Sequence, residues 1–286
     1  MKTLLLIDAN SLIHRFFHAM PPLTTRAGEP AGAIYGLSQV LLKIFLEMKP
    51  DYIDGCFDRP EPTFRDEIYK EYKIHRPPAA KELISQIIRA RELFAKFGAR
   101  VVELAGYEAD DLIGTLAERF KEEPDLKIII FSGDLDNLQL VYGDKIIVQF
   151  LIKGITETIT YDEPAVVAKY GIKPTQLPDL KGFLGDASDN IPGVAGVGPK
   201  TAGPLIQKFG SIEKVYEDIG LVEDKVAKKI AGHKEEALFS KKLATIERHA
   251  PYEVTLPDLK AGELNVESLR KYFSELGFES LVKRLQ

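Results

Sequence analysis

The chain has 286 residues, of which 45% are hydrophobic and 28% are charged, with a formal net charge of −5 at pH 7. This balance is typical of a folded globular protein and excludes a disordered chain. The single cysteine, Cys56, excludes an intrachain disulfide and a zinc site built on cysteines. No apolar run reaches the length of a membrane span, so we expect a cytoplasmic protein without a membrane partner.

The acidic average argues against nucleic-acid binding only if the two signs of charge are evenly mixed. Carboxylates gather in short motifs, whereas basic residues recur at Lys70, Lys73 and Arg76 and again between Lys225 and Lys234. Clustered lysine and arginine residues bind phosphates. The segregation indicates a negative pocket flanked by positive surfaces.

Short apolar runs alternate with amphipathic stretches in the first part of the chain. Runs typical of strands cover residues 3–7, 52–57, 100–104 and 127–131. Stretches with helical spacing of apolar residues include 31–48, 79–97 and 109–121. The alternation predicts an α/β core over residues 1–175, with a mainly parallel sheet flanked by helices.

Two segments differ from this alternation. Residues 69–78 are basic and aromatic and end in prolines, which indicates a segment projecting from the sheet and continued by a helix from Lys81. After about residue 175 the strand pattern fades into short helices separated by glycine and proline. We therefore expect a helical, DNA-binding region over residues 176–286.

Acidic residues follow several of the predicted strands. Asp8, Asp58 and Asp134 all come at or just after the end of an apolar run. Ligands of parallel sheets bind beyond the carboxyl ends of the strands, so these side chains are expected to share one pocket. A charge buried at such a position must be paired or must bind a metal.

Glu108, Asp110 and Asp111 stand together before an apolar helical stretch. Acids in a first helical turn favour the helix dipole by about 0.3 to 1 kcal/mol each, so helix capping is one interpretation. Three acids in four positions exceed what a cap requires. A metal site is the other interpretation.

Two further acidic pairs lie later in the chain. Asp134 and Asp136 are two residues apart, which fits either a shared pocket or an Asx-rich turn. Asp186 and Asp189 are three apart, which places both on one side of a helical turn, with a solvated face or a cap as the alternative.

Nine carboxylates from these motifs would repel one another strongly if they met without cations. They are Asp8, Asp58, Glu108, Asp110, Asp111, Asp134, Asp136, Asp186 and Asp189. Mg²⁺ and Mn²⁺ prefer oxygen ligands, and two such ions can activate a water and stabilise a leaving oxygen in phosphodiester hydrolysis. The motifs therefore predict a site for Mg²⁺ or Mn²⁺, with two ions expected.

Ordered motifs give the chain a family resemblance. They are Pro-Pro-Leu-Thr at 21–24, Gly-Glu-Pro-Ala-Gly-Ala-Ile-Tyr-Gly at 28–36, Tyr-Glu-Ala-Asp-Asp at 107–111, and Gly-Asp-Ala-Ser-Asp-Asn-Ile-Pro-Gly at 185–193. In this order they resemble the 5′ nuclease domain of bacterial DNA polymerase I and its flap endonuclease relatives, from about Leu4 to Lys283. The resemblance implies a PIN-like core and makes the nine acids metal-site residues. Those through Asp111 would mostly hold the catalytic ion, and the later ones would mostly support the second.

The same resemblance gives roles to the basic segment. It implies a helical arch at about 66–97, through or under which a single-stranded 5′ end passes. Lys73 and Arg76 would neutralise the scissile phosphate, and Tyr72 would stack on a base. Without the family context, a solvated basic helix is the favoured interpretation of these residues.

A glycine-rich stretch follows the last acidic pair. Gly193, Gly196 and Gly198 precede Lys200 and Thr201, so backbone amides and a helix N-terminus can approach a phosphate. A simple helix connector is the alternative. The stretch resembles the family's helix-three-turn-helix, expected at about 185–210, which grips duplex DNA and often holds K⁺.

These expectations define a metal-dependent 5′-3′ exonuclease and structure-specific 5′-flap endonuclease. Its partners would be DNA with 5′ flaps, nicks or free 5′ ends, RNA primer strands, and a covalently attached polymerase domain, in primer removal and repair. Two alternatives stay open. One is an RNA-preferring nuclease of the same fold, and the other is a catalytically silent DNA-binding scaffold, which predicts missing acids.

Overall fold

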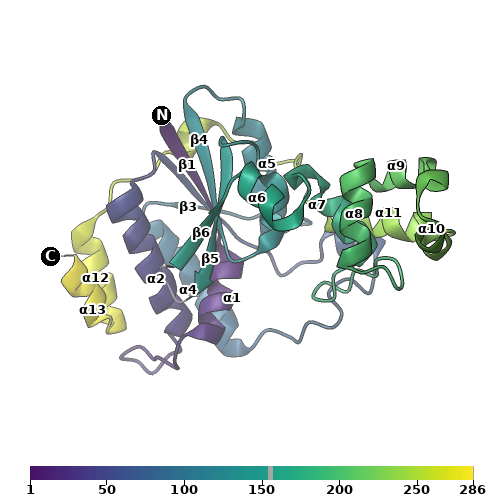
Figure 1. The fold of residues 1–286 in the computed structure, drawn as a ribbon. Helices are drawn as coiled ribbons and strands as arrows, with labels where there is room; N and C mark the ends of the chain where they lie inside the picture. The colour runs from purple at the N-terminus through teal and green to yellow at the C-terminus, as the bar shows by residue number, and fades with distance from the viewer. Residues whose placement is uncertain (154–156, 286) are drawn as a thin grey trace.

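The computed structural model describes residues 1–153 and 157–285 and is organised around a six-stranded sheet (Figure 1). In chain order the strands are β1 Lys2–Asp8, β2 Tyr52–Cys56, β3 Arg100–Val102, β4 Leu126–Ser132, β5 Ile146–Lys153 and β6 Glu157–Tyr161. Their order across the sheet is β3-β2-β1-β4-β5-β6. All neighbours pair in parallel except β5 and β6, which are antiparallel. The predicted α/β class with a mainly parallel sheet is confirmed, and the structure adds β5 and β6 to the four predicted strands.

Both faces of the sheet are covered by helices. Leu4 and Leu6 of β1 belong to one core, with α5, Ala109–Phe120, on that face. Leu5 and Ile7 point to the other face, toward α1, Ala9–Ala19, and α2, Gly32–Lys43. Because side chains alternate across a strand, a sheet buried on both faces needs apolar residues at successive positions. This is why β1 is a continuous apolar run.

The other helices lie on the two faces and at the two ends of the sheet. The α-helices are α1 Ala9–Ala19, α2 Gly32–Lys43, α3 Phe64–Ile68, α4 Lys81–Lys96, α6 Glu163–Tyr170, α7 Leu177–Leu184, α8 Pro199–Phe209, α9 Ile212–Glu217, α10 Asp224–Ile230, α11 Lys234–Ala244, α12 Val266–Leu276 and α13 Glu279–Arg284. A π-helical turn, η1 Ile44–Met48, extends α2, and the 3₁₀ turns are η2 Leu135–Leu140, η3 Pro174–Gln176, η4 Ile219–Leu221 and η5 Leu256–Leu259. Among the described residues, none of the helices has the length and apolar character needed to cross a bilayer.

The segment expected as a helical arch at 66–97 has a different structure. Residues 69–80, which we call the strap, form turns and extended chain rather than a helix. Pro77 and Pro78 disfavour helix at this point. The following α4 does not project, because Leu93 and Phe94 on its apolar side are fully buried against the sheet core.

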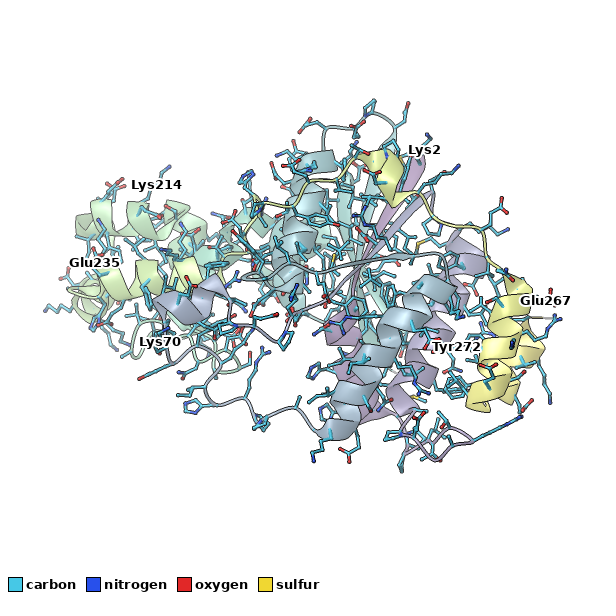
Figure 2. The ribbon with its side chains drawn as sticks, turned by 180° about the vertical axis from the view of Figure 1, so that it is seen from behind. Lys2, Lys70, Lys214, Glu235, Glu267 and Tyr272 are labelled. Carbon is cyan, nitrogen blue, oxygen red and sulfur yellow. The ribbon has the colours of Figure 1, made fainter. Side chains whose placement is uncertain are left out.

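The C-terminal segment also differs from the expected single helical region over 176–286. Helices α12 and α13 pack in the same core as α2, at the end of the molecule opposite α8–α11 (Figure 1). Figure 2 shows this separation, with Glu267 and Tyr272 at one end and Lys214 and Glu235 at the other. The return is fixed where the Gly262 amide donates to the Gly98 carbonyl at 3.0 Å. A side chain at Gly98 would lie 2.9 Å from the Gly262 backbone.

The helical unit at the other end contains α7–α11. Between α7 and α8 the chain makes a turn over residues 185–198, which we call the glycine turn. Gly185 and Gly193 have positive φ angles of 70° and 65°, and a Cβ on either would lie within 2.4 Å of backbone atoms. Only glycine permits this crossing, which presents the acidic loop between them toward the sheet.

Candidate active site

A cavity of about 260 Å³ lies where β1, β2 and β4 end. We call this cavity the acid pocket. Seven of the nine predicted acids line it: Asp8, Asp58, Glu108, Asp110, Asp134, Asp136 and Asp189. Asp111 and Asp186 are not among its lining residues. The carboxyl edge of the parallel sheet therefore brings together acids separated by up to 181 residues (189 − 8) in the chain.

Asp8, which is buried, and Asp110, which is partly buried, form the floor of the acid pocket. Asp8 caps α1 by accepting the Ser11 amide at 3.0 Å and also accepts the Ser132 hydroxyl at 2.6 Å. Burial raises the pKa of Asp8 to about 6 despite these hydrogen bonds. Burial and the repulsion of Asp8 raise the pKa of Asp110 well above its ordinary value. The floor therefore disfavours two bare negative charges.

Asp110 has a further partner that the sequence analysis did not single out. The Asn137 side-chain amide donates to Asp110 Oδ1 at 2.9 Å and is itself fully buried. Asn137 follows the Asp134–Asp136 motif directly in the sequence. Its position directly after these two acids was the available signal.

The motif after β4 turns back on itself. Asp134 accepts the Asp136 amide at 2.9 Å, which forms an Asx turn. The motif therefore forms the Asx turn and also places its acids at the pocket. Burial, with repulsion from Asp134, raises the pKa of Asp136 to about 6 against the opposing pull of Lys181. Both side chains line the acid pocket.

Lys181 of α7 bridges two of the predicted acids. Its ammonium binds both carboxylate oxygens of Asp136 and one of Asp186, the latter at 2.6 Å. Burial works against ionisation of Asp186, but Lys181 and Ser188 outweigh it and lower its pKa to about 2. The sequence analysis missed Lys181, because its partner Asp136 lies 45 positions away and no local pattern links them.

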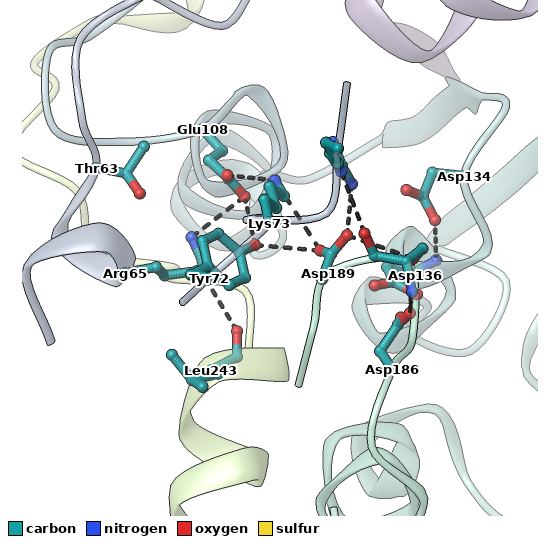
Figure 3. A network of polar contacts seen from close by, with 12 residues as sticks. Thr63, Arg65, Tyr72, Lys73, Glu108, Asp134, Asp136, Asp186, Asp189 and Leu243 are labelled. Carbon is teal, nitrogen blue, oxygen red and sulfur yellow. Dashed lines mark hydrogen bonds and ion pairs between the residues drawn. The ribbon is translucent and has the colours of Figure 1, made fainter. Parts of the chain in front are cut away.

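The strap closes over the outer acids of the pocket. Figure 3 shows Tyr72 and Lys73 placed against Glu108 and Asp189. The Tyr72 hydroxyl lies 3.2 Å from a carboxylate oxygen of each acid. Lys73 forms an ion pair with Glu108, and Arg76 forms one with Asp189. The predicted basic residues thus meet predicted metal-site acids directly.

These contacts set the charge of the outer pocket. Burial disfavours the Lys73 ammonium, but Glu108 and Asp189 outweigh it and raise its pKa. Burial, with Glu108 and Asp189, also raises the pKa of Tyr72, which keeps its hydroxyl protonated. Tyr72 is only 5% exposed, so the expected stacking on a base requires the strap to move.

Asp58 ties the end of β2 to the first turn of α5. Its Oδ1 accepts the Ala109 amide at 2.7 Å, and its Oδ2 accepts the Asn10 side-chain amide at 2.9 Å. Asp58 therefore holds the helix that carries Asp110. Asn10, which the sequence analysis did not select, lies two residues after Asp8.

Asp111 occupies a different place from the one the family resemblance implied. Its side chain is fully buried and faces Arg65, with a bidentate pair at 2.7 and 2.8 Å. It also accepts the Glu108 and Glu247 amides at 3.0 and 2.9 Å. With its oxygens engaged by four donors, Asp111 has no free face toward the acid pocket.

The residues predicted to bind duplex DNA lie outside the acid pocket. Gly193, Gly196 and Gly198 belong to the glycine turn, and Lys200 and Thr201 lie in the first turn of α8. A groove of about 510 Å³ runs beside them between α8 and α10. Its charged lining residues are Lys200, Lys208, Glu223, Lys225 and Lys229. The groove is therefore predominantly basic.

The arrangement of the acids reflects their present partners. Over residues 1–153 and 157–285, the structure has no group of three aspartate, glutamate, histidine or cysteine side chains positioned to hold one ion. Lysine and arginine side chains already engage Glu108, Asp136, Asp186 and Asp189.

Comparison with known families assigns almost the whole chain. Residues 3–171 match the family described as 5'-3' exonuclease, N-terminal resolvase-like domain. Residues 172–267 match the 5'-3' exonuclease, C-terminal SAM fold. The division at 171/172 falls between α6 and η3.

Curated relatives match over the full length of this chain. DNA polymerase I of Bacillus subtilis (strain 168) is 43% identical over 285 residues, which cover 99% of this chain and 32% of that protein. DNA polymerase I of Caldicellulosiruptor bescii is 40% identical, and the match covers 33% of it. The chain thus spans about a third of the length of these polymerases. The 5'-3' exonuclease of Aquifex aeolicus (strain VF5) is 35% identical, over 100% of this chain and 96% of that protein.

Solved structures share the fold at low sequence identity. The phage T5 5'-exonuclease, solved with zinc ions bound, has a TM-score of 0.72 at 19% identity and covers 99% of this chain and 98% of its own. The catalytic core of Rad2 in complex with DNA substrate has a TM-score of 0.62 at 16% identity, with 100% and 93% covered. Together with the family matches, these findings confirm the resemblance seen in the sequence: the chain belongs to the 5'-3' exonuclease family of enzymes.

Proposed function

We propose that this chain is a divalent-metal-dependent nuclease that hydrolyses DNA phosphodiesters near 5′ ends and 5′-flap junctions. The observation that carries the proposal is the acid pocket, where Asp8, Asp110, Asp134 and Asp136 converge under a strap bearing Lys73. An acidic floor fits metal ions, and cations on the facing wall fit the phosphate. The family match supports this activity.

The donor set of the acid pocket fits Mg²⁺ or Mn²⁺. Seven carboxylates line the pocket, and these hard ions prefer oxygen ligands of this kind. Burial, with repulsion from neighbouring acids, raises the pKa values of Asp8, Asp110 and Asp136, which fits a pocket that binds cations. The T5 5'-exonuclease was solved with divalent zinc ions bound, which supports divalent metal use here.

We assign Asp8, Asp110, Asp134 and Asp136 as direct ligands of the ions. Asp58 and Glu108 support these ligands and do not contact the ions themselves. Divalent ions, when bound, lower the pKa of a coordinated water and stabilise charge on phosphate oxygens. Asp8 and Asp110 then belong to the catalytic ion, and Asp134 and Asp136 to the second, as the family resemblance implies. Asp111 is left out of the set, because four donors already engage its oxygens. For the second set, Asp136 and Asp186 must first be released by Lys181.

The chain's cations have a separate role in this proposal. Lys73 and Arg76 neutralise the phosphate that is cut, and they must leave Glu108 and Asp189 to do so. A phosphate entering the pocket offers both residues a new anionic partner. Tyr72, released with them, becomes available to stack on a base.

Duplex binding is assigned to the glycine turn and α8. Backbone amides of Gly196 and Gly198 and the side chains of Lys200 and Thr201 contact phosphates of one DNA strand, and the neighbouring basic groove extends the contact. Gly193 is left out of this set, because its amide is buried and donates to the Ser240 hydroxyl at 3.0 Å. K⁺ is not included in the proposal, because the Gly196 carbonyl already accepts the Lys229 ammonium at 3.0 Å.

The proposed role is removal of 5′-terminated strands, including RNA primers, during replication and repair in the cytoplasm. Polymerase-linked and separate relatives both occur, which supports work beside an attached or associated polymerase. The buried thiol of Cys56 fits a reducing compartment.

Paired substrates test this function. The protein is incubated in Mg²⁺ with matched duplexes carrying a 5′ flap of DNA, a 5′ flap of RNA, or a 3′ flap of DNA. We expect cuts at the 5′-flap junction and little cleavage of the 3′ flap. Preference for the 3′ flap would refute the assigned polarity, cleavage of RNA alone would make it a ribonuclease, and binding without cuts would make it a scaffold.

A further inference from the structure

A buried charge pair outside the acid pocket links three parts of the molecule. Arg65 is 3% exposed and Asp111 is fully buried. Arg65 belongs to α3, which leads into the strap, and Asp111 lies in the first turn of α5 beside Asp110. The pair therefore lies next to the acid pocket. Arg65 lines the pocket, and Asp111 does not.

Arg65 uses its guanidinium almost completely. Its Nη1 and Nη2 donate to the two oxygens of Asp111, its Nε donates to the Leu243 carbonyl at 3.0 Å, and Nη2 also donates to the Thr245 carbonyl at 2.8 Å. Figure 3 shows Arg65 beside Leu243 at the end of α11. Such a bidentate fork fixes orientation as well as distance.

Asp111 is saturated in the same way. Beyond Arg65, its oxygens accept the Glu108 amide at the start of α5 and the Glu247 amide in the segment after α11. A buried charge with this many partners resists displacement, because each abandoned partner would be left unsatisfied. A metal ion would have to break these bonds to use Asp111.

The partners of the pair define what it aligns. Arg65 holds the base of the strap, Asp111 holds the helix end that presents Glu108 and Asp110, and both hold residues 243–247 of the helical unit. DNA gripped by that unit would thus have a rigid connection to the acids. Misplacement of a reacting group by about 1 Å can lower a rate about 100-fold.

We infer that Arg65 and Asp111 are positioning residues, which couple the DNA-binding helical unit and the strap to the acids of α5, and that Asp111 is not a metal ligand. The inference rests on the proposed nuclease function for its rate measurement. Its metal measurement is independent of cleavage.

The test compares wild type with Asp111→Asn, Asp110→Asn and Arg65→Lys. At a temperature where circular dichroism shows each variant folded, three quantities are measured: the number of Mn²⁺ ions bound, the Kd for a 5′-flap duplex in EDTA, and the single-turnover cleavage rate. For Asp111→Asn we expect the wild-type Mn²⁺ number, an unchanged Kd, and a rate lowered about 10- to 100-fold. Asp110→Asn is expected to lose Mn²⁺.

Arg119→Met is the matched control, because Arg119 also joins α5 to another segment through its guanidinium. Arg119 joins the far end of α5 to the Glu253 carboxylate and the Val254 carbonyl, both at 3.1 Å, away from the pocket. Its loss should lower stability and leave the cleavage rate of folded protein unchanged. Arg65→Lys keeps the charge but not the fork, so it tests positioning if Asp111→Asn fails to fold.

Loss of a Mn²⁺ ion in Asp111→Asn would overturn the inference by making Asp111 a ligand. Unchanged single-turnover rates in folded Asp111→Asn and Arg65→Lys would overturn it by reducing the pair to a structural role. Failure of the wild type to cut any flap would refute the proposed function instead, while the Mn²⁺ count would still decide whether Asp111 is a ligand.

Discussion

At the scale of single residues, Asp54 is a buried carboxylate with no function in the pocket. It lies on β2, is fully buried, and neither oxygen meets a hydrogen-bond donor among the described residues. Burial raises its pKa to about 8, with Arg100 opposing the shift. Because the folded state holds this proton more tightly than the unfolded state, Asp54 stabilises the fold at low pH and loses that contribution as pH rises to about 8.

We therefore predict that Asp54→Asn gains stability relative to wild type with rising pH. The difference in the free energy of unfolding should grow by up to about 1.4 kcal/mol per pH unit between about pH 5 and 8 and then level off. Urea unfolding measures it, with the exposed Asp144→Asn as control. A difference that stays constant with pH would contradict the raised pKa.

Single residues also show where prediction from sequence ends. The positions of Asp8, Asp58 and Asp134 at one sheet edge were predictable, because the ends of apolar strands can be recognised locally. The pairing of Arg65 with Asp111 and of Lys181 with Asp136 was not, since these partners are 46 and 45 positions apart. Such contacts depend on how elements pack, so a saturated acid cannot be told from a free one by its motif.

At the scale of elements, the strap is the part that must change for catalysis. In the closed arrangement Lys73 and Arg76 neutralise Glu108 and Asp189. We predict that Lys73→Met lowers the cleavage rate about 100- to 1,000-fold, as expected for loss of one donor to a developing charge. Mn²⁺ binding should be retained or strengthened, because Glu108 loses a competing cation.

Rates and Mn²⁺ affinity measured on the same preparation check this prediction. Lys271→Met removes one exposed lysine from α12, at the far end of the molecule, and controls for the change in net charge. Weaker Mn²⁺ binding in Lys73→Met, but not in Lys271→Met, would contradict a strap that competes with the metal.

Some strands and helices could be predicted from the sequence more accurately than others, for physical reasons. The apolar runs of β1 and β4 are unambiguous because both strands are buried on two faces, whereas the exposed edge strand β6 carries mostly polar residues. The strap has helical composition in part, yet its prolines and its contacts with Glu108 and Asp189 hold it in turns. Packing against neighbouring elements decided these cases.

At the scale of the whole molecule, the buried acids oppose folding when no metal is present. The pKa values of Asp8 and Asp136 are raised to about 6, and that of Asp110 is raised well above its ordinary value. The folded state therefore binds more protons than the unfolded state, and stability falls as pH rises through 6. Asp186, with a pKa lowered to about 2, contributes a constant amount to the free energy of unfolding above about pH 5. It therefore does not reverse this trend.

We predict that in EDTA the free energy of unfolding falls between about pH 5 and 8. Mg²⁺ at 100 times its Kd should restore about 2.7 kcal/mol at the higher pH and less at the lower, where protons compete with the ion. Urea unfolding with and without Mg²⁺ measures both effects. A metal effect that is largest at about pH 5 would contradict the link between the raised pKa values and metal binding.

Single-turnover cleavage of an end-labelled 5′-flap duplex tests whether the acid pocket cuts DNA with divalent metal. Wild type, Asp110→Asn and the exposed control Asp144→Asn are compared in Mg²⁺, Mn²⁺ and EDTA. The account predicts junction cuts by wild type and Asp144→Asn in either metal, none in EDTA, and a large loss in Asp110→Asn. Cleavage that persists in EDTA, or in Asp110→Asn at the wild-type rate, would contradict it.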